Sequence, residues 1–221
     1  MSTPQRSTPP RFFSFDGPKG VGKSTLIEAV TRLIAATNEV TSLEEKSLDP
    51  YREETRALLR QFRETPSYEL ELSICRALAK GRAWISQHVL PTAAGVVLID
   101  RWVPSDAVFR TLVPFDQCAE INRAAGVCEP TVVFAVVCDA AESWRRAHGR
   151  DRGLDSRVVS TWEQHEMSIA QFHRTSETQG WHRVVNDRPV AEVAATVAQL
   201  ILERVSKAPV VSMREMVQKH E

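Results

Sequence analysis

Residues 12–30, FFSFDGPKGVGKSTLIEAV, decide the fold of this chain. The apolar run at the start predicts a buried strand, and residues 17–24 have the spacing G-x-x-x-x-G-K-[ST]. Apolar residues then recur with helical period over residues 22–38, so a helix should follow the turn. A glycine-rich turn between a strand and a helix can surround an anion with backbone N–H groups. We therefore predict that this loop binds the phosphates of a nucleoside triphosphate.

The residue types in the loop suit a nucleotide. Lys23 can reach the β and γ phosphates, and the Ser24 hydroxyl can ligate Mg²⁺. The alternative, in which the glycines only make a tight turn, leaves the Lys, the Ser and the flanking elements unexplained. The nearest match to a guanine-reading N-K-x-D motif is VVNDRP, residues 184–189, which lacks the Lys and argues against a regulatory GTPase. The residues predicted to contact the donor nucleotide are Gly17, Lys19, Gly20, Val21, Gly22, Lys23, Ser24 and Thr25.

Composition narrows the class of protein. Of 221 residues, 43% are hydrophobic and 25% are charged, which is typical of a soluble globular domain. The formal net charge is +0, so no basic field predicts a nucleic-acid polymer as partner. No apolar run approaches 18 residues, and the N-terminus lacks the apolar segment of a secretory signal. We expect a cytoplasmic protein without a membrane partner, whose four scattered cysteines are reduced thiols.

Apolar runs and helical stripes alternate along the chain. Strands are predicted at residues 11–17, 39–45, 95–101, 130–139 and 180–187, the second with a weaker pattern. Helices are predicted at residues 22–38, 52–62, 68–90, 156–179 and 189–205, and residues 140–150 are predicted to start as a helix and run into an Arg-rich loop. This order predicts an α/β fold with a five-stranded parallel sheet and helices on both faces. One domain would span residues 11–205, after a lead-in at 1–10 that is expected to be disordered and before a tail at 206–221 without assigned structure.

Asp100 and Arg101 end the apolar run GVVLIDR, residues 95–101. In an open parallel sheet, ligands bind at the carboxyl ends of the strands. A carboxylate there can hold Mg²⁺ directly or through water, and a guanidinium can hold a phosphate by two parallel hydrogen bonds. We therefore predict Ser24 and Asp100 as magnesium ligands, with a surface ion pair at the strand end as the alternative.

Three segments carry a family resemblance: SFDGPKGVGKST at residues 14–25, IDRWVPSDAVF at 99–109, and the Arg-rich RRAHGRDRGLDSR at 145–157. Together they resemble thymidylate kinase and its relatives among the nucleotide kinases, and the resemblance covers residues 11–205. It implies a three-layer P-loop kinase fold with a five-stranded parallel sheet. It also implies ATP- and Mg²⁺-dependent transfer of the γ-phosphoryl group to a nucleoside monophosphate, with dTMP as the favoured acceptor, and a homodimer.

The resemblance implies roles for residues outside the loop. Arg101 would grip the phosphate of the acceptor, and Arg82, on the preceding helix, would also face the acceptor unless it is a solvated helix residue. The Arg-rich segment would form a lid near residues 145–157, and Arg150 and Arg152 are the best candidates for contact with the transferring phosphoryl group. A solvated basic loop is the alternative. The predicted catalytic residues are Lys23, Asp100, Arg150 and Arg152.

Two further side chains are predicted to contact the acceptor. Asp16 takes the place of an acid that is common in the family, where it would orient the loop or the acceptor, or else serve as a turn acid at the strand end. Trp102 follows Arg101 at the expected mouth of the site, where it would shape the acceptor pocket.

This sequence departs from the family pattern at three places on the acceptor side. Lys19 stands in the loop where the family usually has an acid that approaches the acceptor's sugar. The strand-end R-E-P-G motif of the family corresponds to SLDPYREE, residues 47–54, in which only Asp49-Pro50 match the E-P. Leu78 falls near the Phe that stacks on thymine in the family. Because the donor side is intact, the sequence supports a kinase more strongly than it supports dTMP as the acceptor.

A second resemblance keeps different acceptors open. DRWVPSDAVF, residues 100–109, is also similar to the E-R-S-x-x-S-D segment of deoxynucleoside kinases. A hydroxyl acceptor must lose a proton, and Asp49 would then be the general base, or else a cap of the following helix. A specialised small-molecule kinase and a non-catalytic nucleotide-binding regulatory protein are two further interpretations of the same residues. A pure binder, however, needs neither an Arg-rich lid nor the Asp-Arg pair.

Overall fold

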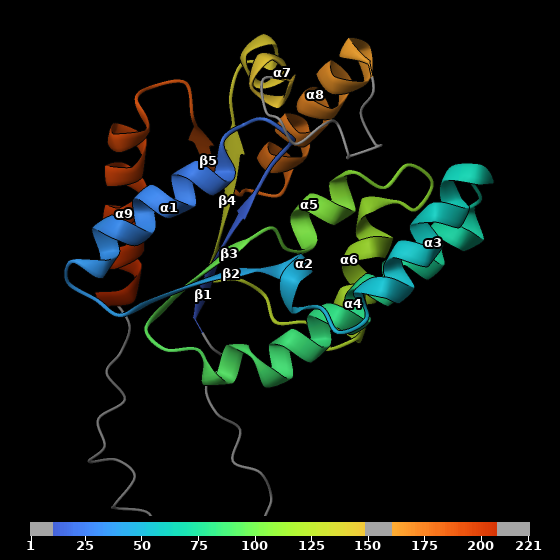
Figure 1. Cartoon of the computed structure of the whole chain (residues 1–221), viewed down its shortest axis with the longest axis horizontal. Helices are drawn as coiled ribbons and strands as arrows, with labels where there is room; N and C mark the ends of the chain where they lie inside the picture. The colour runs from blue at the N-terminus through green and yellow to red at the C-terminus, as the bar shows by residue number, and fades with distance from the viewer. Residues whose placement is uncertain (1–10, 149–160, 207–221) are drawn as a thin grey trace, which may run out of the picture.

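The structure, a computed structural model, describes residues 11–148 and 161–206. Its centre is a sheet of five parallel strands in the order β2-β3-β1-β4-β5 (Figure 1). β1, which leads into the glycine-rich loop, is therefore the middle strand, and β3, which leads into Asp100 and Arg101, is its direct neighbour. The strands are β1 (Phe12–Asp16), β2 (Val40–Glu44), β3 (Val96–Asp100), β4 (Val132–Val137) and β5 (His182–Val185).

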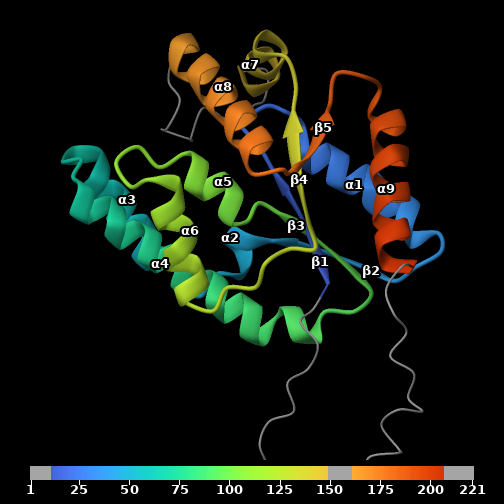
Figure 2. The ribbon, with the colours of Figure 1, turned by 180° about the vertical axis from the view of Figure 1, so that it is seen from behind.

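Helices cover both faces of this sheet, as Figure 2 shows from behind. α1 and α9 pack together on one face, whereas α4, α5 and α8 pack on the other. The predicted class, an α/β sandwich with a five-stranded parallel sheet, is confirmed. The helices are α1 (Lys23–Ala35), α2 (Glu45–Leu48), α3 (Arg52–Glu64), α4 (Tyr68–His88), η1 (Leu90–Thr92), α5 (Val103–Val108), α6 (Phe115–Ala124), α7 (Ala140–His148), α8 (Trp162–Thr178) and α9 (Val190–Ser206).

The two faces of the sheet have separate apolar cores. Phe13 and Phe15 of β1 join the core under α1 and α9, whereas Phe12 joins the core under α4, together with Ile85. Because successive strand residues point to opposite faces and both faces are covered, a central strand is a continuous apolar run. β2 is an edge strand with partly exposed residues, which explains its weaker pattern in the sequence.

Three α-helices, α2, α5 and α6, were not predicted; α2 has only 4 residues, and α6 approaches the site through Asn122, which accepts a hydrogen bond from Arg82. α5 is only 6 residues long and has Pro104 near its start, so it offers no helical stripe. α6 buries Cys118 and Asn122 on its inner face, so its apolar pattern is weak. The predicted start of the helix at residue 156 lies outside the described residues, within which that helix runs from Trp162. No helix in residues 11–148 or 161–206 is long and apolar enough to cross a membrane.

Candidate active site

The glycine-rich loop is a closed turn that wraps its own lysine. Gly20 has φ +82°, a conformation that L residues rarely adopt, and a side chain there would collide with the Ser143 carbonyl of α7. Lys23 is 6% exposed, and its Nζ donates to the carbonyls of Gly17 (2.9 Å) and Pro18 (2.8 Å). The loop ends at Gly22, the N-cap of α1, so it lies where backbone N–H groups and the helix dipole favour an anion.

A cavity of about 250 Å³ opens beside the loop; we refer to it as the donor cavity. Ser24 Oγ donates to Asp100 Oδ2 at 3.0 Å, so the two predicted magnesium ligands lie together. Asp100 Oδ1 is buried and has no hydrogen-bond partner within residues 11–148 and 161–206. A hydroxyl and a carboxylate suit Mg²⁺, which takes its other ligands from water and phosphate. The donor cavity is lined by Lys19, Gly20, Gly22, Lys23, Ser24, Glu44, Glu45, Lys46, Asp100 and Arg101.

Three residues of the predicted donor set lie outside this lining. Gly17 contributes its carbonyl to Lys23, and Val21 is fully buried in the core under α1 and α9. Thr25 is exposed in the first turn of α1. The structure therefore brings Lys19, Gly20, Gly22, Lys23 and Ser24 to one cavity and places the other three around it.

Arg101 leaves β3 in a strained conformation. Its φ of +71° is the only positive φ of a non-glycine residue in the described parts of the chain. Such a residue costs about 1 to 3 kcal/mol and persists where its surroundings force it, often at a functional site. The Arg101 amide donates to the Phe15 carbonyl (3.1 Å) and Nη1 to the Gly17 carbonyl (3.2 Å). The guanidinium is thereby held against the glycine-rich loop.

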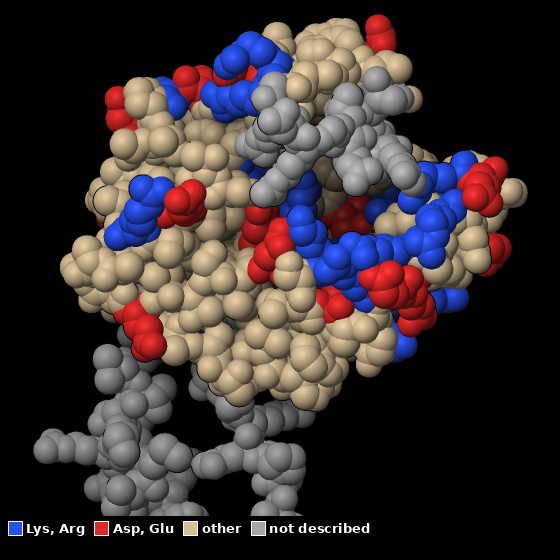
Figure 3. All heavy atoms as spheres, in the orientation of Figure 1, with Lys and Arg blue, Asp and Glu red and all other residues tan. Residues whose placement is uncertain are grey.

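A second cavity, of about 470 Å³, lies between α3, α4 and α5; we refer to it as the acceptor cavity. Lys19, Glu45, Lys46 and Arg101 line both cavities, so the two meet at these side chains. Figure 3 shows a hollow bordered by Lys and Arg with acidic side chains in its floor. The remaining lining residues are Asp49, Arg52, Thr55, Arg56, Leu59, Leu78, Arg82, Trp102, Ser105, Asp106, Phe109, Arg110 and Ser168.

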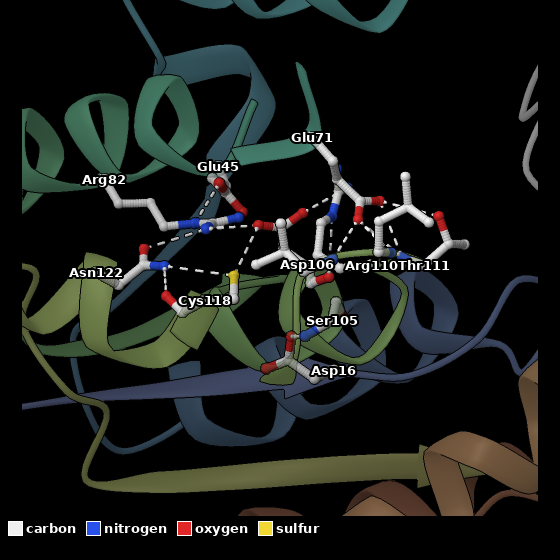
Figure 4. A network of polar contacts seen from close by, with 12 residues as sticks. Asp16, Glu45, Glu71, Arg82, Ser105, Asp106, Arg110, Thr111, Cys118 and Asn122 are labelled. Atoms are coloured by element: carbon white, nitrogen blue, oxygen red, sulfur yellow. Dashed lines mark hydrogen bonds and ion pairs between the residues drawn. The ribbon is translucent and has the colours of Figure 1, made fainter. Parts of the chain in front are cut away.

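The wall of the acceptor cavity contains a chain of buried charges (Figure 4). Arg82, which is 2% exposed, donates from Nε to Glu45 Oε1 (2.7 Å) and from Nη1 to Asp106 Oδ2 and Asn122 Oδ1 (both 3.2 Å). Arg110 Nη2 lies 2.7 Å from Asp106 Oδ1. Arg82 therefore lines the acceptor cavity, but two carboxylates compensate its charge, and its contact with the acceptor stays a prediction. The alternative of a solvated helix arginine is wrong.

Burial and ion pairing shift the pKa values of the two carboxylates in this set of buried charges in opposite directions. Burial raises the pKa of Glu45, and the attraction of Arg82 only partly opposes it. Burial also acts on Asp106, but there the attraction of Arg110 and Arg82 prevails and lowers the pKa of the carboxyl. Asp106 is thus an anion that links two guanidinium groups in the wall of the cavity.

Asp16 and Trp102 lie deeper than the sequence predicts. Asp16 is fully buried outside the lining of both cavities, and its Oδ1 accepts from the amides of Trp102 (3.0 Å) and Ser105 (2.9 Å). Trp102 is fully buried as well, and its Nε1 donates to the Cys128 carbonyl (2.9 Å). Asp16 thus fixes the start of α5, while Trp102 forms part of the acceptor cavity's wall.

Asp49 stabilises the turn before α3 and also lines the acceptor cavity, whereas the N-cap of α3 is Tyr51. Asp49 Oδ1 accepts from the Tyr51 amide at 2.8 Å, just before α3. The carboxylate lies against Gly81 of α4, where any side chain would collide with it. Burial is the first cause of its raised pKa. The turn bond at Oδ1 and a position in the lining of the acceptor cavity are therefore compatible at this residue.

Of the predicted lid, only its first residues are described. Arg145 and Arg146 of α7 both bind Glu142, and these hydrogen bonds lower the pKa of that carboxyl to about 2. Arg146 Nη1 also donates to the Asn186 carbonyl (3.2 Å) and lies beside Gly22 of the loop. Arg150, Arg152 and the rest of 149–160 lie outside the described residues.

Known proteins share this sequence pattern and this fold. The sequence profile described as thymidylate kinase matches residues 15–197. The chain belongs to the thymidylate kinase family. A thymidylate kinase of Levilactobacillus brevis is 29% identical over 173 residues, which are 74% of this chain and 80% of that protein. The structure of thymidylate kinase from Ehrlichia chaffeensis matches with a TM-score of 0.56 at 16% identity, over 87% of this chain and 98% of that one, and supports the fold.

Several lining residues of this thymidylate kinase family site were missed from the sequence. Glu45 and Lys46 follow β2 directly, because that strand ends at Glu44, whereas Asp49 comes only after α2. The end of the weakly patterned edge strand β2 could have indicated Glu45 and Lys46. The match of Asp49-Pro50 to the strand-end motif instead places that motif several residues later. Asp106 and Arg110 lie in and just after the segment similar to the family, but nothing in one sequence shows that Asp106 pairs with both Arg82 and Arg110.

Proposed function

We propose that this chain transfers the γ-phosphoryl group of ATP to dTMP, forming ADP and dTDP. The junction of the donor and acceptor cavities at Lys19, Lys46 and Arg101 carries the proposal. Phosphoryl transfer requires the attacking oxygen and the γ phosphorus to be about 3 to 3.5 Å apart, with cations around them. Membership of the thymidylate kinase family supports dTMP as the acceptor.

In the proposed step, an oxygen of the dTMP phosphate attacks the γ phosphorus as the bond to the bridging oxygen of ADP breaks. The attacking oxygen is already an anion, so no general base is needed. Lys23 would hold the β and γ phosphates, and Arg101 would hold the acceptor's phosphate. Mg²⁺, held by Ser24 and Asp100, would neutralise charge on the donor phosphates.

Lys46 is a further candidate for contact with the transferring group. Its Nζ pairs with Glu44 Oε1 at 2.7 Å, but both side chains are exposed, at 76% and 44%. Exposed ion pairs contribute little to stability, so exchanging the carboxylate for a phosphoryl oxygen costs little. Arg150 and Arg152 keep their predicted role on the transferring group, and homodimer formation and a cytoplasmic location stay predictions.

The test is ADP formation from ATP and Mg²⁺ with dTMP, other nucleoside monophosphates and the matching nucleosides. We expect turnover with dTMP and none with thymidine, since Arg101 needs a phosphate to hold. Lys23→Ala should remove turnover while the circular dichroism spectrum stays unchanged. Turnover only with a nucleoside would indicate that the acceptor is a hydroxyl group and that Asp49 is the general base. Turnover that does not depend on an acceptor would refute the proposal.

A further inference from the structure

One short helix supplies much of the acceptor cavity's wall. α5 is 6 residues long, yet it and the two residues after it contribute Ser105, Asp106, Phe109 and Arg110 to the lining. A helix of this length is not stable by itself, because its few hydrogen bonds do not offset the cost of nucleation. Contacts with the rest of the protein therefore hold it in place: Ala107 and Val108 pack in buried apolar clusters, and carboxylates bind the backbone at and beyond its two ends.

Each end of α5 is held by one buried carboxylate from another element. At the start, Asp16 Oδ1 accepts from the Trp102 and Ser105 amides. At the other end, Glu71 of α4 reaches the segment that follows Arg110 (Figure 4). Glu71 is 2% exposed, so its charge is removed from water almost completely.

The Glu71 carboxylate accepts from three successive backbone amides. Oε1 accepts from the Thr111 amide (2.9 Å) and Oε2 from the amides of Leu112 (2.5 Å) and Val113 (2.7 Å). The Thr111 hydroxyl donates to Oε1 as well (3.2 Å). Successive N–H groups that converge on an anion form a nest, which fixes the path of the backbone. Glu71 thereby fixes the residues directly after Arg110.

Arg110 connects this anchor to the cavity. Its side chain is 14% exposed and its Nη2 lies 2.7 Å from Asp106 Oδ1, while the other oxygen of Asp106 binds Arg82. A shift of residues 111–113 would move the backbone of Arg110 and disturb its ion pair with Asp106. Glu71 itself makes no hydrogen bond to the glycine-rich loop or to Asp100 within the described residues, and the loop contacts α5 at its start, through Ser105, so we expect the donor side to respond less than Arg110.

We propose that Glu71 is a positioning residue that sets the affinity for the acceptor by holding Arg110 in the wall of the acceptor cavity. This inference rests on the proposed function. A carboxylate is required here, because Gln would turn an NH₂ group toward backbone N–H donors and leave buried donors without an acceptor. The loss should therefore appear with the isosteric Glu71→Gln variant and not only after truncation.

The test compares the KM values for dTMP and ATP, and kcat, of the wild type, Glu71→Gln and a matched control, Glu69→Gln. Glu69 lies in the first turn of the same helix and is exposed. Glu71→Gln should raise the KM for dTMP about tenfold, which corresponds to one buried donor left unpaired. The KM for ATP should stay within about twofold, and Glu69→Gln should leave all three constants unchanged.

A second variant keeps the test informative if Glu71→Gln does not fold. Thr111→Val removes only the hydroxyl contact, and it should raise the KM for dTMP by a smaller factor. In an Arg110→Ala background, the effect of either change on this KM should shrink, because both act through Arg110. A lowered melting temperature with an unchanged KM for dTMP would leave Glu71 a purely structural role and overturn the inference. A wild type that neither binds nor phosphorylates dTMP would instead overturn the proposed function, and the inference with it.

Discussion

Replacing Asp106 by Asn should destabilise the protein strongly, because it removes one charge from a buried chain of four. Asp106 is 7% exposed at its side chain and lies 3.2 Å from Arg82 Nη1 and 2.7 Å from Arg110 Nη2. Asn has nearly the same shape but leaves both guanidinium groups without this counter-charge. Breaking a buried pair in this way costs about 3 to 5 kcal/mol. For a domain of this size, the melting temperature should fall by roughly 10 °C.

The pH dependence of the stability difference tests whether the lost charge of Asp106 causes the destabilisation. The pKa of Asp106 is lower in the folded protein than its ordinary value of 3.8, so the folded state binds its proton less readily than the unfolded state. The contribution of the Asp106 carboxylate to the free energy of unfolding is therefore fully present at a pH above its ordinary pKa. It is lost as the pH falls through the lower pKa of the folded protein. The difference in stability between wild type and Asp106→Asn should be constant from about pH 5 to 8 and shrink below about pH 4.

Urea denaturation followed by circular dichroism at several pH values measures this difference. Asp116→Asn is the matched control, since Asp116 is exposed in the first turn of α6 and should change the unfolding free energy by less than about 0.5 kcal/mol. A loss below about 1 kcal/mol for Asp106→Asn at pH 7, or a difference that stays unchanged at pH 3, would refute the account of the buried chain.

Three further predictions concern the junction of the cavities. Arg101→Ala and Arg101→Gly should both raise the KM for dTMP, yet the Gly variant should be about 1 kcal/mol more stable in urea, because it relieves the positive φ; equal stability would contradict the strain. Lys46→Ala should lower kcat about a hundredfold. The control Lys80→Ala, which breaks a similarly exposed pair with Glu54 outside both cavities, should leave kcat unchanged. A change confined to the KM for dTMP would show that Lys46 does not contact the transferring group. Asp100→Asn should raise the Mg²⁺ concentration needed for half-maximal rate, and an unchanged Mg²⁺ dependence would remove Asp100 from the metal.

Five of the eight residues predicted for the donor side lie together at the donor cavity, because the motif that marks them is local. The motif that marks the glycine-rich loop lies within eight residues, residues 17–24, and the flanking strand and helix follow from apolar periodicity, although Ser105, Arg101 and Asn186 also bind the loop. Asp100 could be added because parallel strands end at the same edge of a sheet, and the β1–β3 pairing indeed brings it beside Phe15. These predictions needed only local spacing and one rule of sheet topology.

The acceptor side could not be predicted in the same way, because its contacts join distant segments. Arg82 binds Glu45 and Asp106, and Glu71 binds residues 111–113, so each interaction spans more than twenty residues. No periodicity marks such pairs. The helix that carries Asp106 is also too short to show a pattern, and Asp16, which anchors its start, resembles an ordinary strand-end acid.

The most direct test of the central claim follows the phosphoryl group itself. ATP labelled with ³²P in the γ position is mixed with dTMP, Mg²⁺ and either the wild type or Lys23→Ala, and the nucleotides are then separated. We predict labelled dTDP with the wild type, at a rate equal to that of ADP formation, and none with the variant. Label released as inorganic phosphate, or dTMP recovered unchanged while ATP is consumed, would contradict the claim that this chain is a kinase acting on dTMP.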